Sequence, residues 1–301
     1  MIPDILEPHT SSAASGGVDG AATGGAPSQR LHLHILGSGS KGNCALVEGP
    51  EGLIMIDDGF SRRETISRMH ELDLDEGRVR ALILTHEHSD HVSGVSVWCR
   101  RFEGALFASR GTADARHYLA CLPFEEFMPG DTLHIAGICV TTFPTSHDVV
   151  NPVGFRFSVG DAREGDAIGY ATDTGILTPG AMRALAGARI LALESNHDVP
   201  MLRTGSYPRY LQDRILSERG HLSNAQAAEA VRELVTERTE ELIAMHISQE
   251  NNRPSLAVRA LAEALGATLD NELGSSATLE RPDGPTLHIR SAGQNRPISI
   301  W

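Results

Sequence analysis

LTHEHSDHVSG, residues 84–94, brings together four side chains that can bind a metal: His86, His88, Asp90 and His91. The apolar run VRALIL (79–84) predicts a strand that ends at the first histidine. Because side chains alternate along an extended chain, His86 and His88 project to the same side, and Asp90 and His91 can reach a second position in the following turn. Imidazole suits zinc, iron or manganese, and a carboxylate suits a harder second ion. The stretch therefore predicts a metal centre rather than a polar surface loop.

Apolar and alternating runs on both sides of this stretch predict further strands. They cover 31–37, 44–49, 52–59, 105–109, 131–137, 138–147, 153–160, 167–175, 188–195 and 241–248, with a weaker strand or two in the last 30 residues. Helical spacing predicts helices at 61–74, 92–103, 111–120, 179–186, 223–236 and 254–266. Strands outnumber helices and several follow one another directly, which favours a mixed α/β sandwich over a doubly wound parallel sheet.

The N-terminal residues differ in composition from the rest of the chain. Residues 1–29 consist mostly of Ser, Gly, Ala, Thr and Pro, and they cannot bury enough surface to offset the entropy of ordering. We therefore expect a disordered N-terminal tail and one folded domain over residues 30–301. We expect no membrane span, because no window approaches the roughly 18 consecutive apolar residues that a span requires. A secretory signal is not expected in residues 1–29, and none of the four cysteines forms a C-x-x-C pair. These features favour reduced thiols in a cytoplasmic protein.

The formal net charge of −13 argues mildly against a nucleic-acid partner, because an acidic surface repels phosphate at long range. A local basic groove or bound metal ions can reverse the field where a phosphate sits. Arg203, Arg209 and Arg214 surround the runs ESNHD (194–198) and GHLSN (220–224). They are candidates for phosphate contacts, and a solvated surface is the alternative.

The histidine stretch resembles the His-x-His-x-Asp-His signature of the metallo-β-lactamase superfamily. The resemblance implies an α/β fold, the four-layer αββα sandwich, with the metal site at one edge of the two sheets. The family's later ligands match His147 in FPTSHD, Asp173 in YATDTG and His246 in AMHIS, in the expected order. The resemblance thus implies seven ligands for two ions: His86, His88 and His147 for the first, Asp90, His91 and His246 for the second, and Asp173 as the bridge.

A narrower resemblance extends over nearly all of residues 31–270. The chain is similar to the YycJ/WalJ-type branch of the superfamily in runs such as GSGSKGN (37–43), SHDVVNPVGF (146–155), ESNHDVPML (194–202) and HISQENN (246–252). That bacterial cytoplasmic branch is associated with DNA exonuclease activity. The resemblance implies a hydrolase domain over 30–301 that cleaves nucleic acid, with DNA as the substrate and two divalent ions, Zn²⁺ or Mn²⁺, as cofactors.

Two groups of further residues have candidate roles. Asp57, in IDDG, matches the aspartate of the family's strand motif, which orients the histidine loop from behind the ligands. Its neighbour Asp58 is the alternative. Asn196 and His197 follow a predicted strand, so we expect them to face the cleft and contact substrate. Ser248, in HISQENN, is a further candidate for a substrate contact.

His221 and Ser223, in GHLSN, lie just before a predicted helix. Ser223 is a natural N-cap, and the helix start favours an anion such as phosphate, so Ser223 is a candidate substrate contact. His221 can donate to a phosphate or protonate a leaving oxygen. The alternatives are that Ser223 only caps the helix and that His221 only packs.

The leading functional prediction is metal-dependent phosphodiester hydrolysis, with a hydroxide that bridges two metal ions as the nucleophile. Asp90, Asp173 and His221 are the candidate catalytic residues. One alternative is hydrolysis of a small cyclic phosphodiester, an ester, a thioester or a lactone, since the fold hosts all of these. Another is a non-catalytic regulatory protein that retains the metal site.

Overall fold

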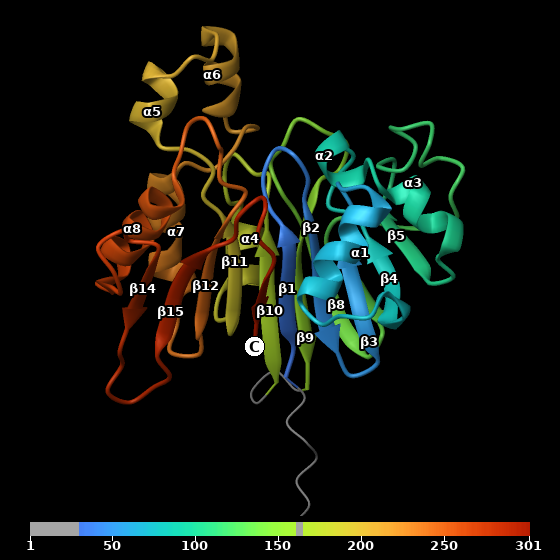
Figure 1. The fold of residues 1–301 in the computed structure, drawn as a ribbon, viewed down its shortest axis with the longest axis horizontal. Coiled ribbons are helices and arrows are strands. Elements are labelled where there is room, and N and C mark those ends of the chain that lie inside the picture. Colours follow the sequence, from blue (N-terminus) through green and yellow to red (C-terminus); the bar gives the residue numbers. More distant parts are fainter. Residues whose placement is uncertain (1–29, 161–164) are drawn as a thin grey trace, which may run out of the picture.

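Two β-sheets face each other in the computed structural model, which describes residues 30–160 and 165–301 (Figure 1). The predicted tail at 1–29 lies outside the described residues. In the described part of the chain the first sheet has the strand order β16-β1-β2-β3-β4-β5-β6 and the second has the order β13-β14-β15-β12-β11-β10-β9-β8-β7. The first sheet consists of β1 (His32–Gly37), β2 (Cys44–Gly49), β3 (Gly52–Ile56), β4 (Val79–Ile83), β5 (Ala105–Ser109), β6 (Phe124–Phe127) and β16 (Ile298–Ile300).

The second sheet carries the other strands. These are β7 (Thr132–Ile135), β8 (Ile138–Pro144), β9 (Val153–Val159), β10 (Asp166–Ala171), β11 (Ile190–Glu194), β12 (Glu241–Met245), β13 (Thr268–Leu269), β14 (Ser276–Leu279) and β15 (Leu287–Ser291). The helices are α1 (Arg62–Glu71), α2 (Ser89–Val92), α3 (Val95–Trp98), α4 (Pro179–Leu185), α5 (Val199–Thr204), α6 (Arg209–Ile215), α7 (Asn224–Leu234) and α8 (Pro254–Leu265), with 3₁₀ turns at Glu76–Arg78 and Cys99–Arg101. No helix in the described ranges is long and apolar enough to cross a membrane.

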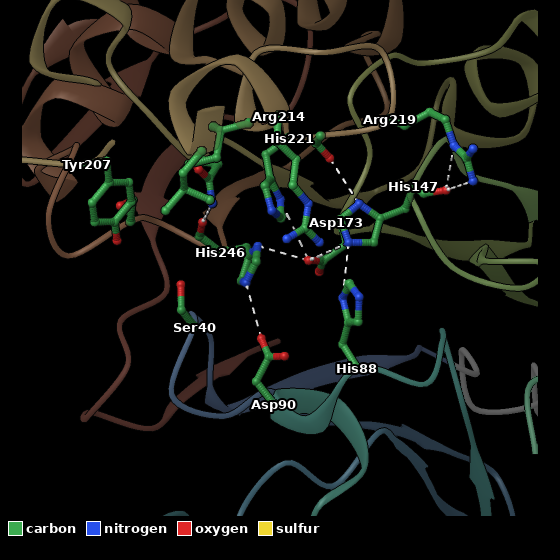
Figure 2. Close-up of a pocket in the computed structure, with 15 residues that line it drawn as sticks. Ser40, His88, Asp90, His147, Asp173, Tyr207, Arg214, Arg219, His221 and His246 are labelled. Carbon is green, nitrogen blue, oxygen red and sulfur yellow. Dashed lines mark hydrogen bonds and ion pairs between the residues drawn. The ribbon is translucent and has the colours of Figure 1, made fainter. Parts of the chain in front are cut away.

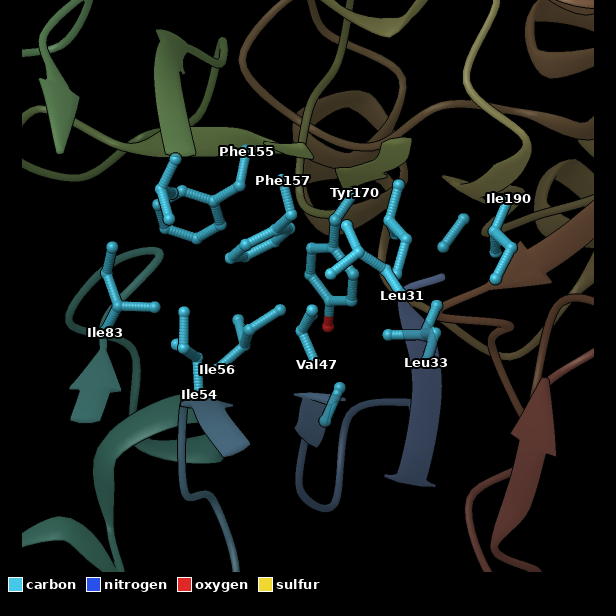
Figure 3. Packing of buried hydrophobic residues seen from close by; sticks show 14 of the residues in the cluster. Leu31, Leu33, Val47, Ile54, Ile56, Ile83, Phe155, Phe157, Tyr170 and Ile190 are labelled. Atoms are coloured by element: carbon cyan, nitrogen blue, oxygen red, sulfur yellow. The ribbon is translucent and has the colours of Figure 1, made fainter. Parts of the chain in front are cut away.

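The main core lies between the two sheets. Ile54 and Ile56 of β3 belong to the same buried cluster as Phe155, Phe157 and Tyr170 of β9 and β10 (Figure 3). Each of these strands buries the side chains of one face there, as the two-residue period requires.

Helices cover the outer face of each sheet. Leu185 of α4, Val231 of α7 and Leu261 of α8 pack in one cluster with residues of β11 and β12. Met69 of α1 and Trp98 of α3 pack in another with residues of the first sheet. The order helix, sheet, sheet, helix confirms the predicted four-layer αββα sandwich.

Parallel pairing decides where the site lies. In the first sheet β3 and β4 are parallel, and in the second β10, β11 and β12 are parallel neighbours. Because the carboxyl ends of parallel strands meet at one edge, the residues after these strands gather there. Helices α5 and α6, which the sequence pattern did not predict, stand above this edge (Figure 1).

Two predicted helices are wrong. Instead of one helix over 92–103 the chain forms α2, α3 and a 3₁₀ turn, because the Gly94 N–H donates to Asp58 O at 2.8 Å rather than extending α2. Residues 111–120 form only turns. There the side-chain hydroxyl of Thr112 donates to Val150 O, and Arg116 Nε donates to Glu87 O, so tertiary bonds hold the segment in place of a helix.

Candidate metal centre

The structure brings the seven predicted ligands together at the carboxyl edge of the strands (Figure 2). His86 follows β4, His147 follows β8, Asp173 follows β10 and His246 follows β12. The other three ligands lie on or next to the short helix α2, and they are His88, Asp90 and His91. Candidate ligand atoms lie within 4.8 Å of one another in each of three groups: His86, His88 and His147; Asp90, His91 and His246; and His86, His91 and Asp173.

Three imidazoles form the first position. His88 Nδ1 lies 3.2 Å from His147 Nε2, and the ring centroids of His86 and His147 are 5.2 Å apart. Burial lowers the pKa of all three rings, which favours the neutral form that binds a metal. The buried Nε2 atom of His86 has no hydrogen-bond partner among the described residues. A cation at this point would satisfy that nitrogen, so the three rings fit a divalent metal.

The second position combines imidazoles with carboxylates. His91 Nε2 lies 3.6 Å from Asp90 Oδ2 and 3.3 Å from Asp173 Oδ2. His246 Nε2 lies 3.8 Å from Asp90 Oδ2 and, in the described part of the chain, is another buried nitrogen without a hydrogen bond. Burial lowers the pKa of His91 and His246, but the neighbouring carboxylates, Asp173 foremost, together outweigh burial and raise both pKa values, that of His246 to about 10. A metal ion that binds here therefore displaces protons.

Asp173 lies between the two positions. Its Oδ2 faces His91, and its Oδ1 lies 3.4 Å from His246 Nδ1 and 3.9 Å from His147 Nε2. Burial raises the pKa of Asp173, but the surrounding histidines together outweigh burial and hold that pKa well below its usual range. A carboxylate that is ionised and faces both ligand sets fits a bridging role.

Asp57 supports the ligands from behind. Its Oδ2 accepts a hydrogen bond from His91 Nδ1 at 2.7 Å, and its Oδ1 accepts one from the backbone N–H of Thr85 at 2.8 Å. This contact directs the other ring nitrogen of His91 toward Asp173. Asp58 instead accepts a hydrogen bond from Thr65 at 2.6 Å, away from the ligands. The geometry favours Asp57 over Asp58 as the residue that orients the histidine loop.

Glu194 is a site residue that the sequence analysis did not single out. It ends β11 and is fully buried, and its Oε1 accepts hydrogen bonds from His221 Nδ1 at 2.8 Å and His246 Nδ1 at 3.0 Å. Burial raises the pKa of Glu194, but the adjacent His221 and His246 together outweigh burial and lower the pKa to about 2. Glu194 thus fixes the orientation of His221, whose ring is one-fifth exposed and lines the cavity. The sequence signal that could have identified Glu194 is its position as the acidic residue at the end of the apolar run ARILALE.

The four candidate substrate contacts separate into two pairs. Asn196 and Ser248 line the cavity above the ligands, which has a volume of about 240 Å³. Asn196 Nδ2 also donates to His246 O at 2.8 Å. His197 and Ser223 are buried and are not among the described residues that line the cavity. The structure therefore does not support the prediction that His197 and Ser223 contact substrate.

The reason for the position of Ser223 is helix capping. Its Oγ accepts from the Gln226 backbone N–H, and Gln226 Oε1 accepts from the Ser223 backbone N–H, which makes a capping box at the start of α7.

We expect Ser223→Ala to lower the free energy of unfolding by about 1 kcal/mol and to leave kcat/KM unchanged, because only the cap is lost. Urea denaturation and steady-state kinetics measure the two effects, with Ser223→Thr as the control that keeps a hydroxyl. A drop in activity at unchanged stability would contradict this interpretation.

Two arginines, Arg214 and Arg219, are among the residues that line the cavity. Arg214 donates to Asp148 Oδ2 at 2.7 Å, and Arg219 donates to His147 O at 3.3 Å. Arg203 and Arg209 instead face Asp213 on the outer side of α6. Of the three arginines that the sequence put forward, the structure brings only Arg214 to the cavity.

Comparison with known proteins finds a matching family and similar relatives. Residues 53–247 match the family described as Beta-lactamase superfamily domain. The chain is 33% identical over 239 residues to Exodeoxyribonuclease YycJ of Bacillus anthracis, an alignment that covers 78% of this chain and 89% of the relative. It is 36% identical over 247 residues to Exodeoxyribonuclease WalJ of Streptococcus pneumoniae, covering 78% and 90%.

Solved structures share the fold at low sequence identity. Zinc-bound PqqB from Methylobacterium extorquens superposes with a TM-score of 0.62 at 16% identity, over 90% of this chain and 99% of the other. At this identity the likeness concerns the fold alone.

Proposed function

Because the chain belongs to the beta-lactamase superfamily and, within it, to the YycJ/WalJ-type family, we propose that it is a DNA exonuclease. It is a hydrolase of the metallo-β-lactamase fold that uses divalent metal ions. The observation that carries the proposal is the pair of ligand sets, both faced by Asp173, at a cavity that Arg214 and Arg219 also line. DNA as the substrate, Zn²⁺ or Mn²⁺ as the ion and the cytoplasm as the location are further parts of the proposal. The names of the two relatives support the choice of DNA.

The seven ligands would hold the metal ions, His86, His88 and His147 on one side and Asp90, His91 and His246 on the other, with Asp173 facing both. When bound, two such ions lower the pKa of water toward neutrality and stabilise the charge that develops on a phosphate. Arg219 adds positive charge at the cavity, and Arg214 lines it while paired with Asp148, so a phosphate meets guanidinium groups there despite the net charge of −13.

His221 is the proposed proton donor to the leaving oxygen. Its Nδ1 donates to Glu194, which is ionised, and its ring lines the cavity, so Nε2 is the nitrogen left to carry a proton there. Glu194 also accepts hydrogen bonds from the backbone N–H groups of Thr174 and Leu222, at 2.8 and 3.2 Å. These bonds fix the carboxylate, and through it the ring of His221.

The test of the function is digestion of end-labelled DNA with Mn²⁺ or Zn²⁺, with His88→Ala as the control. We expect a ladder of shortened products from the wild type and none from His88→Ala. Bis-(p-nitrophenyl) phosphate and a thioester are assayed in parallel. Equal cleavage by wild type and variant would indicate a contaminating nuclease. Thioester cleavage without DNA cleavage would indicate that the enzyme acts on a different class of substrate. A wild type that holds metal and cleaves nothing would favour a regulatory protein.

Removal of the proposed proton donor gives a second test. We expect His221→Ala to lower kcat on DNA by about 10²-fold, the usual contribution of a general acid. Hydrolysis of bis-(p-nitrophenyl) phosphate should fall much less, because p-nitrophenolate leaves without a proton. Metal content, measured alongside, should stay at the wild-type level. The exposed His117 provides a matched control in His117→Ala, and an equal loss on both substrates would contradict the assigned role.

A further inference from the structure

We propose that the α6 side of the cavity binds the base of the terminal nucleotide, and that Tyr207 is the residue on which this base stacks. The inference rests on the proposed function and specifies which part of a DNA end enters the cavity. Tyr207, Leu211 and Ile215 all line the cavity together with the metal-centre residues.

Tyr207, Leu211 and Ile215 form an aromatic and apolar wall of the cavity, and their spacing in the sequence explains it. Leu211 and Ile215 are one helical turn apart on α6, and Tyr207 lies four residues before Leu211, just outside the helix. Residues four apart lie on one face of a helix, so Leu211 and Ile215 face the cavity together. Asp213, on another face, pairs with Arg203 at 2.8 Å outside the cavity. The wall is therefore a defined face of α6.

The backbone holds Tyr207 in position. Pro208 follows it, and a residue before proline is restricted to extended conformations. Gln212 is buried, and its Nε2 donates to the backbone carbonyl of Tyr207 at 2.8 Å. An aromatic ring on a restrained backbone loses little entropy when a ligand stacks on it.

Cationic groups also line the cavity: Arg214 lies on α6 itself, next to Ile215 in the sequence, and Arg219 lies beyond the helix. Figure 2 places Tyr207 and Arg219 at opposite ends of the row of site residues, with His246, Asp173 and His147 between them. A phosphodiester alone needs the cations and the metal centre, and it offers nothing for an aromatic and apolar wall to bind. A nucleotide has both parts, because every base presents a flat π-face that stacks on aromatic side chains.

The size of the cavity limits what enters it. Its volume of about 240 Å³ lies below the usual range for small-molecule sites, about 300–1,000 Å³. A duplex, whose major groove alone is about 12 Å wide, does not fit such a space. A single unpaired terminal nucleotide is the part of DNA that can reach both the wall and the ligands, so the end of the strand must leave the stack.

The experiment compares two DNA substrates that differ only in the terminal nucleotide, one with its base and one abasic. We expect wild type to degrade the normal end with roughly ten-fold higher kcat/KM than the abasic end, since stacking on an aromatic residue contributes about that much. Tyr207→Ala should lose this preference by degrading the normal end more slowly, while the rate on the abasic end stays the same. Tyr207→Phe, which keeps the ring, should retain the preference.

Tyr210→Ala is the matched control. Tyr210 lies on α6, is 76% exposed and is not among the described lining residues, so its removal should leave the preference intact. Metal content and melting temperature of each variant check that the fold is kept. A full preference in Tyr207→Ala, or none in wild type, would overturn the inference while leaving the exonuclease proposal intact. Failure of wild type to degrade either DNA would overturn both.

Discussion

Removal of divalent ions by a chelator is expected to abolish hydrolysis and to lower the melting temperature by roughly 10 °C. A ligand present at about 1,000 times its Kd stabilises the folded state by about 4 kcal/mol, and each kcal/mol shifts the melting temperature of a domain this large by about 2–4 °C. Without the ions, the buried Nε2 atoms of His86 and His246 lose the metal that would bind them, and among the described residues they have no hydrogen-bond partner to replace it. Thermal denaturation with and without EDTA, followed by addition of Mn²⁺ or Zn²⁺, measures both effects.

The matched control for chelation is His88→Ala, which removes one ligand of the first position. Its melting temperature should respond less to EDTA than that of the wild type, because fewer ions are held. Activity of the wild type should return on metal addition, which separates metal loss from irreversible unfolding. A wild type that is equally stable and equally active in EDTA would contradict a metal-dependent site.

The clustering of the candidate ligands follows from a pattern that is local in the sequence. His86, Asp173 and His246 each come directly after an apolar run that reads as a strand. Because β10 and β12 belong to one parallel set and β4 to another at the same edge, the residues after those runs meet in space. Strand ends could therefore be predicted from the sequence, whereas the choice of His147, Asp173 and His246 as partners of the histidine stretch came from the resemblance to the family.

Other features depend on contacts that no local pattern encodes. Glu194 is one acidic residue at the end of a strand, and its position matters because His221 and His246, 27 and 52 residues away, both donate to it. The turns at 111–120 have helical spacing, yet the bonds of Thr112 and Arg116 to distant carbonyls outweigh that preference. In both cases the deciding partner lies far away in the chain.

The backbone of the site is a third such feature. Asp57, Asp173 and His246 have positive φ values of 57°, 51° and 51°, a conformation that non-glycine residues rarely adopt. Asp57 and His246 directly follow strands of the parallel sets and Asp173 follows one after a single residue, so the left-handed turn directs the side chain into the site. Strain of this kind persists where the surrounding structure fixes it, and it is common at functional sites. It also guides the choice of substitution at Asp173, since Asn tolerates this conformation better than Ala does.

Asp173→Asn is expected to lower kcat by at least about 10³-fold and to reduce the bound metal from two ions toward one. The amide keeps the shape of the side chain and the φ of 51°, but it lacks the negative charge that faces His91 and His246 at 3.3 and 3.4 Å. The two ligand sets are then no longer joined by an anion, and two cations held close together repel each other without it. Steady-state kinetics on DNA and elemental analysis of the purified protein measure the two losses.

The control for the loss of charge is Asp114→Asn, a change of the same kind at an exposed position. It should keep wild-type activity and both metal ions. If Asp173→Asn also kept both, the carboxylate would not be the link between the two positions, and Asp90 alone would have to supply the anionic charge of the second site. If activity fell while both ions stayed bound, the role of Asp173 would be to orient the reacting groups rather than to hold the cations. Joint loss of one ion and of activity is the result that a bridging carboxylate requires.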